Sequence, residues 1–472
     1  MPVIPPGQRW HEEVDIGVVG AGGCGLVCAH TAARDDLRVV IWEKSKAAGG
    51  STALSGGIVG AAGTRMQHAA GVADSSEEFA SDVLGRNHNR SDPALTRRLC
   101  ESSAALVEWL TDTRGIQMEL LAQTTDRGHT RLRLHAPPSR SGQAFIDGLL
   151  RSLERRGIRL RLGTPVLQLW SDADGAVVGV QVKIPKKSPT NVRCGKLILA
   201  TGGFGANRTL LARHCEAAAA LDYIGGPTSD GDALTWAEDV GAATRDLGAF
   251  EAHATVAVGS RHLVPWVLVT SGAILVNQRG ERFGDERGGP AALVTPVLSQ
   301  PGGVAYEVFD ARILKAVTAD DPHFASEVVP RAVRRGDDVV GLARQFQIDP
   351  DALVRTINAY NETAPEPFAP PFFGIRVSAA LLQTQGGLLI DANARVLRSD
   401  GTPVPNLYAG GGAAVGCSGP GADGYLLGNG LLCALGWGRI AGEQAALELL
   451  AARATPDEPA PQPDGEPGAA VD

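Results

Sequence analysis

The sequence lacks closely spaced cysteines. Its seven cysteines are scattered along the chain, and no Cys-x-x-Cys pair occurs. An odd number without paired spacing argues against a disulfide framework, a redox-active dithiol motif and a zinc ribbon. Cys24 and Cys28 stand four residues apart in a predicted helix, and we interpret them as small core residues.

Long apolar runs and an excess of positive charge are also missing. The longest apolar stretch, residues 263–276, is shorter than the roughly 18 residues of a membrane span and contains Pro265 and Gly272. Residues 1–20 show no charged segment followed by an apolar one, so no cleaved signal peptide is expected. The net charge of -8 argues against a nucleic-acid surface, which needs a basic face. We therefore expect a reduced, cytoplasmic protein without membrane or nucleic-acid partners.

A nucleotide-binding motif follows the first predicted strand. In the segment VDIGVVGAGGCG, Gly20, Gly22 and Gly25 form a Gly-x-Gly-x-x-Gly fingerprint between a β-branched run and a helix-like segment. A second apolar strand ends at Glu43, 23 residues after Gly20, where roughly 20 are expected for a ribose-binding acid. The glycines let a pyrophosphate approach the helix N-terminus, and the acid accepts hydrogen bonds from ribose hydroxyls. The pattern predicts a dinucleotide-binding domain.

A second glycine-rich segment indicates which dinucleotide binds. Residues 46–63 contain Gly-Gly pairs at 49–50 and 56–57, which frame Ser51, Thr52 and Ser55. Glycines let the backbone approach a ligand closely, so the far half of a long ligand is expected here. FAD fits this pattern better than NAD.

The rest of the chain divides into an interrupted nucleotide domain and an insert. At 472 residues it is too long for one compact core, so two or three domains are expected. From about residue 243 to 373 the pattern differs from that of the flanking strand-and-glycine segments. The tail, 453–472, is rich in proline and acid and is predicted to be disordered. The other predicted elements are helices over 91–115, 141–157, 229–242 and 429–450, a hairpin around Asp174-Gly175, and a buried strand starting at 196.

Taken together, the motifs resemble those of one family. In chain order they are the fingerprint, GGSTALSGG, ATGGFG, SDGDAL, AHAT, GAILVNQRGERF, QGGLLID, NLYAGGG and GNGLLCALGWGRIAG. Apart from its tail, the chain resembles the flavoprotein family of fumarate reductases, succinate dehydrogenase flavoprotein subunits and 3-ketosteroid dehydrogenases. The resemblance implies an α/β fold whose Rossmann-like FAD-binding domain, 1–242 and 374–452, is interrupted by an inserted α+β capping domain, 243–373.

The resemblance also implies the cofactor and its contacts. Covalent members carry a histidine where this chain has Gly50, so we predict non-covalently bound FAD. The substrate would lie between the cap and flavin N5, where hydride is transferred across a carbon–carbon bond. The implied FAD contacts are Gly20, Gly22, Gly23, Gly25, Glu43, Lys44, Gly50, Ser51, Thr52, Gly56, Gly57, Val166, Ala200, Thr201, Gly202, Asp232, Gly411, Asn429 and Leu431.

Candidate catalytic residues follow from the departures from the fumarate reductase pattern. His253 of the HAT motif carries over, whereas Arg287 lies three places before the position of the family's proton-donating arginine. Gln383 replaces a histidine before Gly-Gly. Tyr425, four places before Asn429, replaces the arginine that clamps a carboxylate. Losing a bidentate arginine removes the strongest carboxylate recognition, so we predict a neutral carbonyl substrate, or one with at most one carboxylate.

The leading hypothesis is α,β-desaturation of a cyclic ketone. Tyr425 and Gln383 would hold the ketone oxygen, and Arg287, His253 or a tyrosinate would take the α-proton. The alternatives are an ene-reductase acting on an enone or a monocarboxylate, and a flavin-binding protein without turnover. No haem-binding or iron–sulfur cysteine motif occurs, so a separate or diffusible electron partner is expected. No cluster has the spacing of metal ligands.

Overall fold

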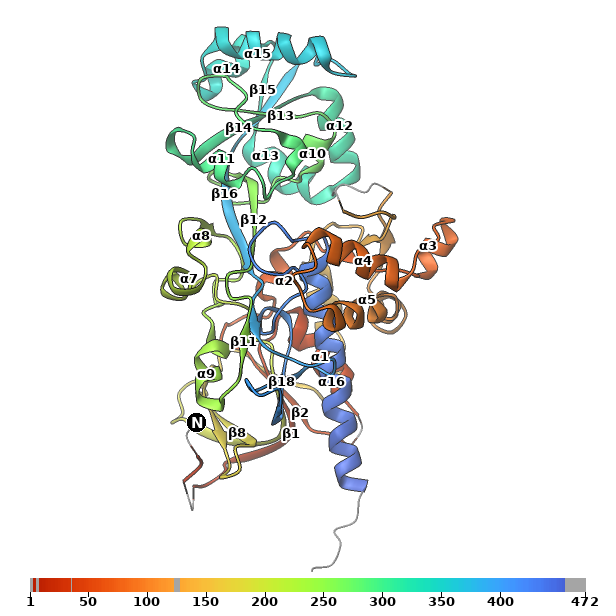
Figure 1. The fold of residues 1–472 in the computed structure, drawn as a ribbon, viewed down its shortest axis with the longest axis vertical. Coiled ribbons are helices and arrows are strands. Elements are labelled where there is room, and N and C mark those ends of the chain that lie inside the picture. Colours follow the sequence, from red (N-terminus) through yellow and green to blue (C-terminus); the bar gives the residue numbers. More distant parts are fainter. Residues whose placement is uncertain (1–2, 6–7, 35, 123–127, 455–472) are drawn as a thin grey trace, which may run out of the picture.

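The computed structural model describes residues 3–5, 8–34, 36–122 and 128–454. Within these residues the chain forms two packed regions, which lie at the lower and upper ends of Figure 1. Each region has its own main sheet and its own cluster of buried side chains. We call the upper region the cap. The predicted disordered tail lies, from residue 455 onward, outside the described residues.

The lower region is built on a mostly parallel sheet. Its strand order is β18-β19-β9-β1-β2-β6, and the predicted hairpin around Asp174-Gly175 is confirmed as β7–β8, which joins the sheet beside β9. β1 and β2 are runs of mainly buried apolar residues, as expected for strands covered on both faces. The strands are β1 Glu12–Val19, β2 Val39–Trp42, β6 Arg159–Arg161, β7 Val166–Ser171, β8 Val177–Val182, β9 Thr190–Leu199, β18 Arg395–Leu397 and β19 Pro403–Ala409.

Two helices pack closely against each other and against this sheet. α1 spans Gly23–Ala32, and α16 spans Asn429–Ala454 (Figure 1). A methyl group added at Gly438 would lie 2.5 Å from the carbonyl oxygen of Cys24, so the two backbones approach too closely for a larger residue. Cys24 and Cys28 are 6% and 0% exposed, which confirms that they are core residues.

Shorter helices cover the flank of the lower region. The helices predicted over 91–115 and 141–157 are present but end earlier, because a π-helical turn and a 3-10 turn follow them. The small sheet β3-β5-β4 contacts α3 through β4 and α16 through β3. The elements are α2 Gly50–Leu54, α3 Arg65–Ala69, α4 Ser76–Arg86, α5 Pro93–Glu108, α6 Gln143–Leu150, β3 Val59–Gly60, β4 Glu119–Leu120 and β5 Leu134–Ala136.

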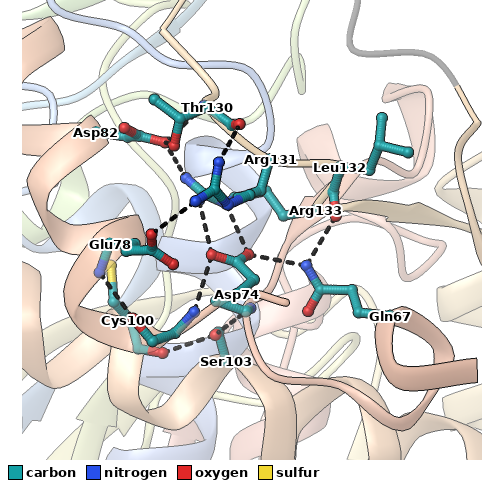
Figure 2. A network of polar contacts seen from close by, with 12 residues as sticks. Gln67, Asp74, Glu78, Asp82, Cys100, Ser103, Thr130, Arg131, Leu132 and Arg133 are labelled. Carbon is teal, nitrogen blue, oxygen red and sulfur yellow. Dashed lines mark hydrogen bonds and ion pairs between the residues drawn. The ribbon is translucent and has the colours of Figure 1, made fainter. Parts of the chain in front are cut away.

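A buried ionic network fixes α4 to the segment before β5. The fully buried guanidinium of Arg133 binds Asp74 at 2.8 and 3.0 Å and also forms an ion pair with Asp82 of α4 (Figure 2). A buried charge is costly unless it is paired, so the network requires all its members. At the end of α4, Nε of Arg86 donates to the carbonyl oxygen of Tyr425 at 3.1 Å.

The cap contains a second, mainly antiparallel sheet. Its order is β10-β16-β14-β13, and β12 and β15 also pair with the 13-residue strand β16. β12 and β16 run from the cap toward the lower region (Figure 1). The strands are β10 Asp222–Tyr223, β12 Phe250–Ala257, β13 Ile274–Val276, β14 Val304–Asp310, β15 Val333–Gly336 and β16 Phe372–Thr384.

Helices surround the cap sheet, whereas α9 (Asp232–Val240) packs in the lower region. α9 confirms the helix predicted over 229–242. β11 Thr244–Arg245 and β17 Gly387–Leu388 form a two-stranded sheet. These strands belong to the two segments of the chain that connect the cap strands β12 and β16 to the lower region. The helices are α7 Arg208–His214, α8 Glu216–Ala219, α9 Asp232–Val240, α10 Val267–Thr270, α11 Val294–Leu298, α12 Ala311–Asp320, α13 Val329–Ala332, α14 Val339–Phe346 and α15 Pro350–Thr363.

This architecture confirms the predicted α/β fold in which a second region interrupts a Rossmann-like domain. The buried cluster of the cap draws its side chains from residues 204–221 and 250–381. The predicted boundaries at 243 and 373 remain predictions. Among the described helices, none combines the length and apolarity needed to cross a bilayer.

Candidate active site

A cavity of about 1110 Å³ extends from the parallel sheet into the cap. The strands β1, β2, β9 and β19 run in the same direction, so their carboxyl ends meet at one edge of the sheet. Gly20, Glu43, Ala200 and Gly410 directly follow these strands and line the cavity. Ligands of open parallel sheets bind at this edge, beyond the carboxyl ends of the strands.

The fingerprint glycines are required by the geometry of the turn between β1 and α1. Gly20 has a φ of +108°, and a methyl group there would lie 2.3 Å from the carbonyl oxygen of Ala200. A methyl group on Gly25 would lie 1.9 Å from the carbonyl oxygen of Gly20. The N-terminus of α1 lines the cavity, and its N-cap, Gly22, has no side chain to cover the N–H groups, of which that of Gly23 is bound by the Thr52 hydroxyl.

Glu43 lies at the end of β2 with its carboxylate already oriented. Its two oxygens accept hydrogen bonds from the backbone N–H groups of Ala21 at 2.8 Å and Ser45 at 2.7 Å. Its neighbour Lys44 forms ion pairs with Asp230 and Asp232, both at 2.8 Å. Burial lowers the pKa of Lys44, but these hydrogen bonds outweigh burial and raise it. Glu43 therefore presents an oriented carboxylate in the cavity wall, and its predicted role in binding a ribose stays a prediction.

The second glycine-rich segment forms another wall of the cavity. The hydroxyl of Ser51 accepts a hydrogen bond from the backbone N–H of Gly226 at 2.9 Å, and the hydroxyl of Thr52 accepts one from Gly23 at 3.2 Å. These contacts join α2 to the fingerprint turn and to the segment after β10. The hydroxyl residues therefore help to shape the wall.

The predicted FAD contacts fit a long dinucleotide in this cavity. All of them line it except Gly25, Gly57 and Asn429. Gly25 is needed for the fingerprint turn, because a side chain there would overlap the carbonyl oxygen of Gly20. Asn429 is fully buried, and among the described residues its side-chain nitrogen and oxygen have no hydrogen-bond partner. The glycine cradle, the open helix N-terminus and the oriented acid match the chemistry of FAD.

Three of the four predicted catalytic residues line the same cavity. They are His253, Gln383 and Tyr425. A methyl group added at Gly430 would lie 2.2 Å from Nε2 of Gln383 and 3.4 Å from the hydroxyl of Tyr425. These two polar groups therefore meet above the first turn of α16.

His253 is a neutral hydrogen-bond donor. Its Nδ1 accepts the backbone N–H of Thr255 at 3.3 Å, and the Thr255 hydroxyl lies 3.1 Å from both Nδ1 and the carbonyl oxygen of Val264. Since Nδ1 accepts, the ring proton of the neutral imidazole lies on Nε2. Burial lowers the pKa of His253 to about 3. The ring also meets Trp266 edge-on, with the centroids 5.8 Å apart.

The structure does not bring Arg287 to the other three residues. Its side chain is 80% exposed and forms a bidentate ion pair with Asp285 at 2.8 and 2.9 Å. These hydrogen bonds raise the pKa of Arg287. Pro290 and Ala291 line the cavity in its place. Residues 286–288 form a 3-10 turn away from the cavity wall, so the position of Arg287 does not support its predicted role.

Glu251 lines the cavity and was not identified from the sequence. It lies directly opposite Gln383 in the β12–β16 pair, and Nε2 of Gln383 donates to its Oε2 at 2.6 Å. A single acidic residue two positions before a histidine is not a recognisable sequence motif. Its position depends on the register of two strands far apart in the sequence, and that register shifts between Glu251 and Ala252.

The cap closes the other end of the cavity with polar side chains. His262 and His323 line it with their ring centroids 6.0 Å apart. Arg140 of the lower region lies 3.9 Å from Asp320 at the end of α12. This contact spans the two regions beside the cavity.

Comparison with known proteins identifies the family. A family model described as an FAD binding domain matches residues 15–430. An NADH:fumarate oxidoreductase of Klebsiella pneumoniae (strain 342) is 32% identical over 452 residues. The alignment covers 92% of this chain and 48% of that protein, so the chain spans about half the length of this relative.

Two solved structures resemble the protein over nearly its whole length. One is the open conformation of a flavocytochrome c3 fumarate reductase, with a TM-score of 0.83 and 29% identity over 93% of this chain and 79% of that chain. The other is a 3-ketosteroid-Δ4-(5α)-dehydrogenase from Rhodococcus jostii RHA1 in complex with 4-androstene-3,17-dione. Its TM-score is 0.73, with 25% identity over 94% of this chain and 99% of that chain.

Proposed function

Because the chain belongs to the FAD binding domain family, it is an FAD-dependent oxidoreductase, and we propose that it acts on a CH–CH bond beside a neutral carbonyl group. The proposed reaction is the α,β-desaturation of a cyclic ketone. One observation supports it most directly: Tyr425, Gln383 and the neutral His253 line one cavity with the FAD-binding glycines. None of these three side chains carries a positive charge.

The residues at the sheet edge would hold the cofactor. The fingerprint turn and the N-terminus of α1 would bind the pyrophosphate, and Glu43 would bind a ribose. The wall that contains Ser51 and Thr52 would contact the other half of FAD. When bound, FAD supplies a two-electron acceptor for the hydride released from the substrate β-carbon.

The neutral donors would bind the ketone oxygen. Tyr425 offers its hydroxyl, and His253 offers the proton on Nε2. Gln383 uses one amide hydrogen for Glu251 and has a second one to offer. Donors directed at an oxygen that becomes negative stabilise the transition state, and they make the adjacent α-C–H more acidic.

The charges in the cavity favour a neutral substrate over a dicarboxylate. Glu251 places a carboxyl group beside Gln383, where the resemblance to fumarate reductases would require a cationic or ionisable contact. Of the cavity-lining arginines, Arg140 is paired with Glu119, whereas Arg86 and Arg261 each donate to a backbone carbonyl oxygen and keep their charge. A dicarboxylate would bring negative charge toward Glu251, and position 425 carries a tyrosine in place of the arginine that could bind that charge.

The direction of the reaction depends on the electron partner. The structural similarity to a ketosteroid dehydrogenase supports oxidation of a ketone. The similarity to an NADH:fumarate oxidoreductase supports the alternative, reduction of an enone or a monocarboxylate. A separate or diffusible electron partner is part of both proposals.

An anaerobic absorbance experiment tests the proposal. The purified yellow protein is mixed with a panel of cyclic ketones and simple acids, and the flavin band is followed. Bleaching by a saturated ketone is the expected result. Recolouring of the chemically reduced protein by an enone or enoate, without bleaching by any ketone, would establish the reductive alternative. If neither occurs with any compound, the proposed ketone chemistry is wrong and a flavin-binding protein without turnover is favoured.

A further inference from the structure

The proposed reaction needs a group that removes the α-proton. Arg287 lies outside the cavity and is paired with Asp285. His253 uses Nδ1 as an acceptor from Thr255 and carries its proton on Nε2, so the ring has no lone pair to offer the substrate. A neutral phenol such as Tyr425 is a better donor than base near neutral pH.

Glu251 has the position and the chemistry that these groups lack. It lines the cavity on β12, the strand that also carries His253. Its Oε2 accepts from Gln383 at 2.6 Å, and the two residues face each other across neighbouring strands. An amide donor at this distance fixes the orientation of the carboxylate. A carboxylate base combined with neutral donors at the carbonyl oxygen is an established solution for removing a proton beside a ketone.

We propose that the carboxylate of Glu251 is the catalytic base that accepts the substrate α-proton, and that Gln383 is its positioning residue. The inference rests on the proposed function. In the oxidative direction the α-C–H bond breaks and an O–H bond forms on Glu251. The electron pair of the α-C–H bond would become the new carbon–carbon π bond as hydride leaves the β-carbon, and bound oxidised FAD would supply the acceptor for that hydride. In the reductive direction Glu251 returns the proton to the α-carbon.

The test compares E251Q and E251D with a matched surface variant, E281Q. Glu281 is 56% exposed on the turn after β13 and does not line the cavity. For each variant we would measure FAD content, thermal midpoint and ketone affinity from the flavin spectral shift. We would then measure exchange of the substrate α-hydrogen with D₂O by NMR, and anaerobic flavin reduction against pH.

E251Q is expected to keep its FAD and its ketone affinity. It should lose α-hydrogen exchange and flavin reduction by about 10²- to 10⁴-fold, the usual contribution of a general base. In the unmodified protein, the rate of flavin reduction should fall at acidic pH because protonation of the Glu251 carboxylate removes the base. This fall should be absent in E251Q. E251D keeps a carboxylate and should retain more exchange than E251Q. E281Q should behave as the unmodified protein.

Two outcomes would overturn the inference. In the first, E251Q exchanges the α-hydrogen at the rate of the unmodified protein. In the second, E251Q and E251D lose exchange equally together with FAD or ketone affinity, which would mean that Glu251 only supports the fold of the site. Both differ from failure of the proposed function, in which the unmodified protein itself reacts with no ketone and no enone.

Discussion

Replacing Tyr425 with phenylalanine removes one hydroxyl and leaves the ring. Tyr425 lines the cavity, and its hydroxyl lies close to Nε2 of Gln383 above Gly430. Its backbone is held separately, by Arg86 through the carbonyl oxygen. Because the ring and the backbone contact remain, Y425F should fold, bind FAD and keep its yellow colour.

The expected loss of activity can be estimated from the number of donors. Removing one donor from an oxyanion site typically costs about 10²–10³ in kcat, or roughly 2.7–4 kcal/mol. His253 and Gln383 remain beside the carbonyl oxygen and can partly compensate. We therefore expect a loss near the lower end, about 10²-fold in the rate of flavin reduction.

Stopped-flow reduction of the flavin by a saturating ketone measures this step without the electron partner. A suitable control is Y306F, because Tyr306 is 3% exposed within the cap, packs on Phe346 and does not line the cavity. If Y425F reduces its flavin within about threefold of the unmodified protein, a change well below 1 kcal/mol, Tyr425 is not the carbonyl donor.

Three further predictions concern the cofactor, the fold and pH. G25A should lose FAD, because the added methyl group would overlap the carbonyl oxygen of Gly20. The loss is measured as flavin absorbance per protein. The control G85A, on an open face of α4, should keep its FAD. R133M should lower the unfolding free energy by about 3–5 kcal/mol in urea titrations, because it removes the cation that is paired with the buried carboxylate of Asp74. An unchanged midpoint would show that the network is dispensable. Burial raises the pKa of Glu307 from 4.5 to about 8, so the folded state retains a proton that the unfolded state releases. Stability should therefore be full below about pH 4.5 and fall as the pH rises to about 8, and E307Q should flatten this slope in urea titrations at several pH values.

The glycine turn and the acid at the sheet edge could be located from the sequence because this part of the cavity is built from nearby residues. The turn between β1 and α1 is specified by Gly20 and Gly25, whose neighbours leave no room for a side chain. Glu43 follows from the length of one strand–helix–strand unit. Such features depend on short-range geometry, and spacing along the chain is enough to find them.

The substrate end could be predicted only in part because it is assembled from distant segments. Gln383 and Glu251 are brought together by the register of β12 on β16, including a shift that no sequence pattern announces. Arg287 matched a family position only after an offset of three residues, and the turn at residues 286–288 directs it to solvent. Offsets of this kind change which side chain faces a cavity without changing the motif around it.

The arrangement of charge explains how one cavity can both bind a ketone and remove its proton. Donors at the carbonyl oxygen must carry a proton. Burial lowers the pKa of His253 to about 3, so the ring is a neutral imidazole, and its one ring proton lies on Nε2 because Nδ1 accepts from Thr255. A base must instead stay ionised and oriented, and the hydrogen bond from Gln383 favours this state of Glu251. An arginine in place of Tyr425 would add a positive charge to the same cavity and reduce the basicity of that carboxylate. A neutral phenol is therefore the donor that is compatible with a carboxylate base, so the exchange of arginine for tyrosine and the presence of Glu251 are expected to occur together.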